Sequence, residues 1–319
     1  MSVQFDDARD LLAEAGKFQD PKVTRDGQER ASVAFKGYDT LWFNTGTLCN
    51  LACQNCYIES TPKNDRLQYL SLAEVEDFIE QLIEDGSGRE IGFTGGEPFM
   101  NPEFLAILEA ALSRGFEVLV LTNAMKPMWH KRDGLLELQE KYGAQLTLRV
   151  SLDHYAQEKH EMERGPNSWR PALQGLSWLA ENGFNIHIAS RTFWGEDDAA
   201  MRKGFARFFA AEKLPIDAMD PMQLILFPEM DGDLAVPEIT TACWGILDVD
   251  PANMMCASSR MIVHRKGDAQ AKALACTLLA YDAEFEMGLD LKQARQSVYL
   301  NHPHCAKFCV LGGGSCSVS

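Results

Sequence analysis

The amino-acid sequence predicts an α/β protein built on a partial (βα)6 barrel, followed by a small domain made of a hairpin and a helix. Six short segments rich in Val, Ile, Leu and Phe alternate with segments of helical periodicity between residues 40 and 227. Such alternation is typical of a parallel sheet with right-handed crossover helices. A closed eight-unit barrel needs roughly 250 residues, whereas this region spans about 190. We therefore expect an open barrel of six units.

The elements of this barrel follow a polar segment, residues 1–36, for which we expect one short helix (8–16) and a loose connection. Ser71 and Glu74 form a capping box that begins a helix, and Gly86 ends it. Asn101-Pro102 and Gly115 bound the next helix. Three more helices are expected at residues 133–142, 171–181 and 196–211. The expected strands are residues 40–44, 90–93, 117–121, 146–151, 185–190 and 223–227.

The pattern changes after about residue 236. Residues 260–265 and 272–279 indicate a hairpin around Gly267-Asp268, and residues 290–300 indicate one helix. Six of the nine cysteines lie in this last quarter of the chain. The expected division is an N-terminal extension (1–36), the barrel (37–235) and a C-terminal domain (236–319).

Composition and charge narrow the class of protein. The chain has 46% hydrophobic and 24% charged residues, an ordinary globular composition. Its formal net charge of −16 disfavours nucleic acid and anionic membrane surfaces as partners. No run approaches the roughly 20 apolar residues of a membrane span, and charges interrupt the N-terminus where a secretory signal would need an apolar core. We therefore expect a cytoplasmic protein whose cysteines serve metal or redox chemistry rather than disulfides.

The most informative segment is the loop that carries Cys49, Cys53 and Cys56, directly after the first barrel strand. Active sites of parallel barrels lie at this carboxyl end of the strands. A [4Fe–4S] cubane normally takes four thiolates, so three local cysteines leave one iron with the open position of a catalytic metal site. Two alternatives stay open on spacing alone: a zinc knuckle, and a ferredoxin-like cluster completed by a distant cysteine.

The spacing Cys-x3-Cys-x2-Cys, with Tyr57 after the last cysteine, resembles the signature of radical S-adenosylmethionine (SAM) enzymes. Gly95-Gly96-Glu97-Pro98, after the second strand, resembles the second motif of that family. The resemblance covers about residues 37–235 and implies a partial barrel of the TIM type. It also implies that the amine and carboxylate of SAM chelate the open iron, with Gly95, Gly96 and Glu97 at the amine.

Further SAM contacts are implied at the ends of later strands. Ser151 resembles the ligand of the ribose hydroxyls, and Asp153 is expected to support it. Arg191 matches a basic residue that pairs with the SAM carboxylate, a role that suits the guanidinium fork. Tyr57 is expected at the adenine edge and the pocket wall. The alternatives are polar residues that cap helices, an Arg191 ion pair at the surface, and a core tyrosine.

The C-terminal cysteines resemble the ligands of a twitch domain, a smaller relative of the SPASM domain, which implies one auxiliary [4Fe–4S] cluster. Cys256 and Cys276 flank the hairpin, Cys305 follows the expected helix, and Cys309 and Cys316 compete for the fourth position. The close pair here is Cys-x3-Cys, where Cys-x2-Cys is commoner in those domains. Cys243 is expected to be a buried free thiol. The alternative is a structural zinc site formed by these cysteines or by His302 and His304.

The implied reaction is reductive cleavage of SAM to a 5′-deoxyadenosyl radical that abstracts hydrogen from a substrate. A one-electron donor such as flavodoxin or ferredoxin is the implied partner. Oxidation or cross-linking of a small molecule is the favoured outcome, because only about 36 residues precede the barrel, too few for a peptide-recognition domain. A maturase acting on a separately encoded peptide is the alternative. A functional hypothesis of a different class is a non-catalytic iron–sulfur electron carrier or a zinc-binding scaffold.

Overall fold

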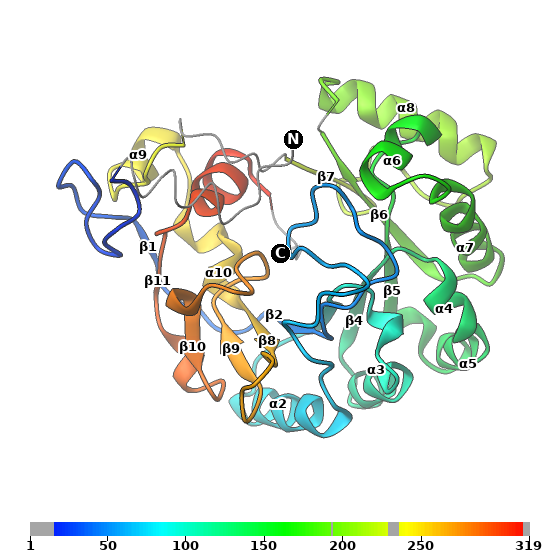
Figure 1. Cartoon of the computed structure of the whole chain (residues 1–319), viewed down its shortest axis with the longest axis horizontal. Helices are drawn as coiled ribbons and strands as arrows, with labels where there is room; N and C mark the ends of the chain where they lie inside the picture. The colour runs from blue at the N-terminus through cyan, green and yellow to red at the C-terminus, as the bar shows by residue number, and fades with distance from the viewer. Residues whose placement is uncertain (1–15, 193, 229–235, 315–319) are drawn as a thin grey trace.

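The computed structural model describes residues 16–192, 194–228 and 236–314, and it confirms the α/β class. Six strands run parallel and neighbour one another in chain order (Figure 1). They are β2 (Thr40–Asn44), β3 (Glu90–Thr94), β4 (Glu117–Thr122), β5 (Leu146–Ser151), β6 (Asn185–Arg191) and β7 (Leu224–Phe227). Each lies within one or two residues of its expected bounds, because buried parallel strands read as continuous apolar runs.

The helices between these strands cover the outer face of the sheet (Figure 1). They are α2 (Leu72–Asp85), α3 (Phe104–Ser113), α4 (Lys126–His130), α5 (Arg132–Tyr142), α6 (Gln157–Arg164), α7 (Trp169–Glu181) and α8 (Asp198–Ala211). The capping box of α2 is confirmed: Ser71 Oγ accepts from Glu74 N, and Gly86 at the other end has a φ of +70°. The core between sheet and helices is aromatic where Phe93 contacts both Phe43 and Phe104.

The inner face of the sheet is shaped by one close contact between β2 and β3. A Cβ atom on Gly92 would lie 2.5 Å from the ring of Trp42, so glycine at this position makes room for the indole. Trp42 is fully buried and lies in the wall of the cavity described below. Trp42 therefore fills part of the barrel interior beside the cavity, as side chains fill the interior of other parallel barrels.

The C-terminal part continues the same sheet. β8 (Ser259–Val263) pairs parallel to β2, and β9 (Lys272–Leu274) and β10 (Glu286–Gly288) follow as antiparallel strands. The expected hairpin around Gly267 is therefore present, with a shorter second strand. The N-terminal segment packs on this part: Ala31 N donates to Ile239 O, and buried Arg30 pairs with Glu238.

The helix expected at residues 290–300 is wrong. The segment forms a short 3₁₀ turn (Gln293–Arg295) and then β11 (Val298–Tyr299), which pairs antiparallel with β1 (Ser32–Val33). Pairing with a distant strand overrides local helical pattern here, because Val and Tyr are good strand formers. The helix expected at 8–16 falls almost wholly outside the described residues, and the domain limits at 36 and 235 stay predictions.

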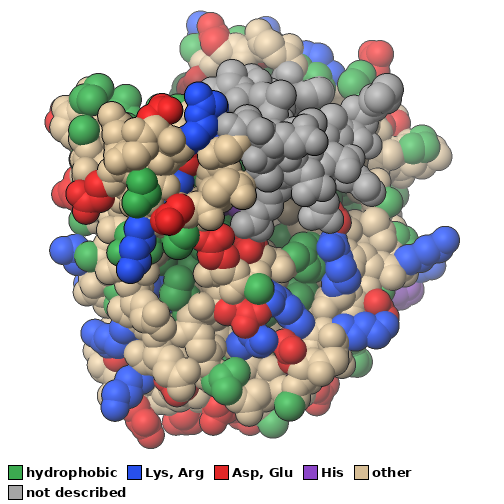
Figure 2. All heavy atoms as spheres, turned by 60° about the vertical axis from the view of Figure 1, so that its left-hand side comes forward, with side chains coloured by type: hydrophobic (Ala, Val, Ile, Leu, Met, Phe, Trp, Pro, Cys, Tyr) green, Lys and Arg blue, Asp and Glu red, His purple; other side chains and the backbone are tan. Residues whose placement is uncertain are grey.

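Two features concern the membrane and nucleic-acid partners that the sequence disfavours. In the part of the chain that the structure describes, no helix combines the length and apolar character that crossing a membrane requires. On the face shown in Figure 2, Lys and Arg side chains are interspersed with Asp and Glu side chains.

Candidate metal and cofactor site

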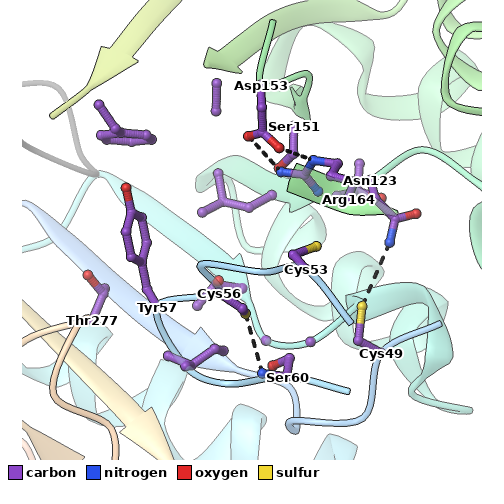
Figure 3. Close-up of a pocket in the computed structure, with 18 of the residues that line it drawn as sticks. Cys49, Cys53, Cys56, Tyr57, Ser60, Asn123, Ser151, Asp153, Arg164 and Thr277 are labelled. Carbon is purple, nitrogen blue, oxygen red and sulfur yellow. Dashed lines mark hydrogen bonds and ion pairs between the residues drawn. The ribbon is translucent and has the colours of Figure 1, made fainter. Parts of the chain in front are cut away.

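The three cysteines of the first loop line one cavity of about 180 Å³ at the carboxyl ends of the barrel strands (Figure 3). Backbone pairing closes this loop at its base, where Cys49 N donates to Thr61 O. Burial raises the pKa of the Cys49 thiol to about 12 and that of Cys53 to about 11. Among the described residues, no three His, Cys, Asp or Glu side chains converge on a single-ion site. Three thiols around one cavity can each bind a different iron of one cluster.

Gly95 and Gly96 hold the cysteine loop against the end of β3. Gly96 N donates to Gly46 O at 2.7 Å, and Glu97 N donates to Leu48 O at 3.1 Å. A Cβ atom on Gly96 would lie 2.2 Å from Leu48 O. Gly95 has a φ of +152°, a conformation that side chains disfavour. Both glycines also line the cavity, so they can approach a ligand as well as the loop.

Glu97 differs from the two glycines because it does not line the cavity. Its buried carboxylate accepts from Thr122 Oγ1 at 2.8 Å and from Asn123 N at 2.9 Å. Burial raises its pKa to about 7, despite these hydrogen bonds. Glu97 therefore fixes the end of β4, and its expected contact with the SAM amine stays a prediction.

Asn123 links Glu97 to the cysteine loop, because its backbone bonds to the Glu97 carboxylate and its side chain bonds to the loop. Its Nδ2 donates to Asn50 Oδ1 at 3.0 Å and lies 3.9 Å from Cys49 Sγ (Figure 3). The sequence analysis did not identify this residue. Its only local signal is its place directly after a barrel strand, which polar residues of many roles share.

Four charged side chains form a buried network on the barrel side of the cavity. Arg164 donates to both carboxylate oxygens of Asp153, at 2.6 and 3.1 Å. Arg191 lies 3.8 Å from Asp153 and 3.3 Å from Glu163. Burial by itself would raise the pKa of Asp153, but the two guanidinium groups hold it below its usual value. The network is thus two cations against two anions.

The predicted SAM contacts Ser151, Asp153, Arg191 and Tyr57 all line the same cavity. Figure 3 shows Ser151 beside Asp153, and the expected support of Ser151 by Asp153 stays a prediction. The guanidinium of Arg191 lies 4.5 Å from the centre of the Tyr57 ring and donates to Asn55 O. Arg191 is therefore already engaged by protein groups, and its contact with a SAM carboxylate stays a prediction.

Glu163 clamps the turn between Cys53 and Cys56, and the sequence analysis missed it. Its carboxylate accepts from Asn55 N at 2.9 Å and from Asn55 Nδ2 at 2.8 Å, while its backbone oxygen accepts from Gln54 N. Helix α6, which carries both Glu163 and Arg164, has no clear apolar periodicity, so its sequence gave no signal for either residue.

We expect Glu163→Gln to loosen this turn, because the amide keeps one acceptor and loses the charge that faces Arg191. Removing one partner of a buried ion pair typically costs about 3–5 kcal/mol. The variant should therefore retain less iron than the unchanged protein after desalting, with a broadened electron paramagnetic resonance (EPR) spectrum. Glu158→Gln, on the exposed face of the same helix, is the matched control. Equal iron retention in the two variants would contradict the clamp.

A second, smaller cavity of about 30 Å³ collects four of the C-terminal cysteines. Cys256 belongs to α10 (Met255–Ser258), Cys276 follows β9, and Cys305 and Cys309 lie one turn apart on the helical segment Cys305–Leu311. Positions four apart share a helix face, so Cys-x3-Cys suits a helix here. Burial raises the pKa of Cys256 to about 11 and also raises that of Cys305.

The other cysteines and histidines that the sequence offers as ligands do not line the second cavity or lie outside the described residues. Cys316 lies outside the described residues. Cys243, in α9 (Cys243–Leu247), lines neither cavity and lies 3.4 Å from Thr240 Oγ1. It is only half-buried, so the expected full burial is wrong, because α9 buries none of its side chains completely. His302 and His304 contact each other edge to face, with ring centres 4.5 Å apart, and do not line the second cavity.

The two cavities share a wall. Thr277 and Leu278, directly after Cys276, line both of them. Figure 3 shows Thr277 on the side of the first cavity away from Ser151 and Asp153. A ligand in the first cavity can therefore contact the segment that carries Cys276.

Comparisons with known proteins place the sequence around the first cavity in a family. The model of the Radical SAM superfamily matches residues 43–203. The antilisterial bacteriocin subtilosin biosynthesis protein AlbA of Bacillus subtilis (strain 168) is 29% identical over 159 residues, 48% of this chain and 34% of that protein. The S-adenosylmethionine-dependent nucleotide dehydratase of Selenomonas ruminantium is 35% identical over 75 residues, 24% of this chain and 26% of that protein.

Solved structures also show a similar fold. Streptococcus suis SuiB bound to the precursor peptide SuiA superposes with a TM-score of 0.57 at 13% identity, over 87% of this chain and 66% of that chain. The matches to the two curated relatives span about a third or less of each relative's length.

Proposed function

The chain belongs to the radical SAM superfamily, and from this premise we propose that it is an enzyme that abstracts a hydrogen atom from its substrate. The superfamily uses a [4Fe–4S] cluster and SAM, the cofactors that the cysteine loop predicts. When bound and reduced by an external one-electron donor, the cluster would supply the electron that cleaves the C5′–S bond of SAM to methionine and a 5′-deoxyadenosyl radical. The observation that carries the proposal is the convergence of Cys49, Cys53 and Cys56 on one cavity with Gly95 and Gly96.

The protein's own groups have separable roles in this proposal. Cys49, Cys53 and Cys56 hold three irons, and Gly95 and Gly96 leave room for the methionine part of SAM. Ser151 lies where it can bind the ribose, with Asp153 held in place by Arg164 and Arg191. The cavity is recessed at the ends of the strands, and a bound ligand that displaces its water would help to protect a reactive carbon radical from side reactions.

An assay for 5′-deoxyadenosine tests the proposal. The protein is reconstituted anaerobically with iron and sulfide, then given dithionite and SAM. We expect slow release of 5′-deoxyadenosine and methionine without any substrate. Release of neither from protein that carries a reducible cluster would favour a non-catalytic electron carrier. Zinc bound in place of iron would favour a zinc scaffold.

We infer an auxiliary [4Fe–4S] cluster at Cys256, Cys276, Cys305 and Cys309, with Cys316 as the competing fourth ligand. Four thiolates around one cavity favour a fully ligated cluster, which suits electron transfer rather than substrate binding. The shared wall at Thr277 and Leu278 supports a short path between the two sites. The electron donor, a flavodoxin or ferredoxin, and the cytoplasmic location stay predictions.

Iron analysis of the double variant Cys276→Ala/Cys305→Ala checks the auxiliary cluster. Two cubanes hold about eight irons per chain, and one holds about four. We expect the reconstituted protein to bind about eight irons and the double variant to bind about four, because at most half of a cubane's four usual thiolates then remain in the second cavity. About four irons in the unchanged protein would contradict the second cluster.

The substrate class is open between two candidates. A small molecule is the prediction from the sequence, and the similarity to a nucleotide dehydratase supports it. A peptide is the alternative, and the longer match to a bacteriocin biosynthesis protein supports that one.

A further inference from the structure

The charged groups in the wall of the first cavity leave no cation available for an anionic substrate. Four charged side chains line it among the described residues: Asp153, Glu163, Arg164 and Arg191. Arg164 is bound to Asp153 through two nitrogens, and Arg191 is shared between Asp153, Glu163 and Asn55 O. Moving Arg191 to a new anion would take the ion-pair partner away from buried Glu163, and moving Arg164 would leave Asp153 with Arg191 alone at 3.8 Å, so both moves are unfavourable.

Helix α6, which reaches this cavity, also disfavours an anionic ligand. Glu163 and Arg164 are the last two residues of α6, so this helix presents its carboxyl end to the cavity. The carboxyl end of a helix carries partial negative charge, whereas phosphate sites use the amino end. A phosphate group would therefore meet an unfavourable helix dipole and no uncommitted guanidinium.

Apolar side chains also contribute to the lining. Four of them, here called the apolar wall, are Trp42, Ile58, Phe227 and Leu278, and they lie among hydroxyl and amide groups that include Ser60, Asn123 and Thr277. An aliphatic or aromatic group can bury its surface against the apolar wall without displacing an ion pair.

We propose that the group delivered to this cavity is uncharged and largely apolar, as is an aliphatic or aromatic side chain of a peptide, and not a phosphorylated nucleotide. The inference rests on the proposed function and selects between its two substrate classes. The step it concerns is one hydrogen-atom transfer: a substrate C–H bond breaks, a C–H bond forms at C5′ of the radical, and a substrate carbon radical remains. No acid or base takes part, so an apolar wall suffices.

Deuterium transfer tests the substrate class on the reconstituted full chain with SAM and dithionite. The probes are two capped tripeptides, acetyl-Gly-Leu-Gly-amide and acetyl-Gly-Phe-Gly-amide with deuterated Leu and Phe side chains, and GTP deuterated on its ribose. We expect 5′-deoxyadenosine one mass unit heavier from at least one peptide and only light product from GTP. Heavy product from GTP, or from no probe while light product accumulates, overturns the proposal. Absence of light and heavy product alike contradicts the proposed function instead.

Substitution of the apolar wall gives the second arm of this experiment. Leu278→Arg places a cation in the wall, and the heavy-to-light ratio with the peptide probe should fall about tenfold or more, because an unpaired buried charge opposes an apolar ligand. Leu278→Met keeps volume and polarity and should retain the ratio. Leu289→Arg, at an exposed leucine, controls for added charge. An unchanged ratio in Leu278→Arg with full iron content would overturn the assigned wall.

Discussion

Replacing Cys53 by alanine is expected to abolish formation of 5′-deoxyadenosine from SAM. Cys53 lines the cavity between Cys49 and Cys56 and lies on the turn that Glu163 clamps. With two thiolates in place of three, a second iron loses its protein ligand, and the cluster dissociates or takes up a different form. The assay is anaerobic turnover with dithionite and SAM, read as nucleoside released per chain.

The matched control for this variant is Cys243→Ala. Cys243 lies in the part-buried helix α9, away from both cavities, so it tests the general cost of losing a thiol. We expect it to keep cleavage and iron content. Cleavage by Cys53→Ala at the rate of the unchanged protein would show that the trio does not hold the catalytic cluster.

Replacing Gly96 by valine is the second large effect that the structure predicts. The Cβ of any side chain at this position would lie 2.2 Å from Leu48 O and 2.6 Å from Thr47 O. Both neighbours are backbone atoms of the cysteine loop. A backbone oxygen cannot rotate away from the new Cβ atom as a side chain can. Overpacking costs typically about 1–3 kcal/mol even where side chains can adjust, and here the loop itself must move.

The expected result for Gly96→Val is loss of the SAM cluster while the auxiliary cluster stays. Iron should fall from about eight to about four per chain, and SAM cleavage should stop. Gly245→Ala is the matched control, because a Cβ on Gly245 meets nothing within 4 Å and its φ is not positive. Full iron content and cleavage in Gly96→Val would mean that the two loops do not need this close contact.

The sequence predicted the barrel strands well and the connections less well, for physical reasons. A strand such as β5 is an apolar run whose burial is decided locally. β11 instead depends on β1, more than 260 residues away, and no local pattern encodes that pairing. Helix α6 was missed because its eight residues carry no apolar stripe and its buried side chains are His160 and Glu163.

In the candidate site too, locally encoded residues could be predicted and residues that depend on distant parts of the chain could not. Cys49, Cys53 and Cys56 could be identified because the chemistry fixes both residue type and spacing. Glu163, Arg164 and Asn123 could not, because their roles depend on what the fold brings opposite them. Glu97 belongs to a recognisable motif, yet its carboxylate bonds to Thr122 and Asn123 rather than lining the cavity.

The most direct test of the central claim is pulsed EPR of the reduced protein with labelled SAM. The SAM carries ¹⁷O in its carboxylate and ¹⁵N in its amine, and the sample is reduced under conditions that slow cleavage. If one iron of the cluster at Cys49, Cys53 and Cys56 lacks a protein ligand, both labels will show hyperfine coupling to the cluster. A reduced cluster whose spectrum is the same with labelled and unlabelled SAM would contradict the claim.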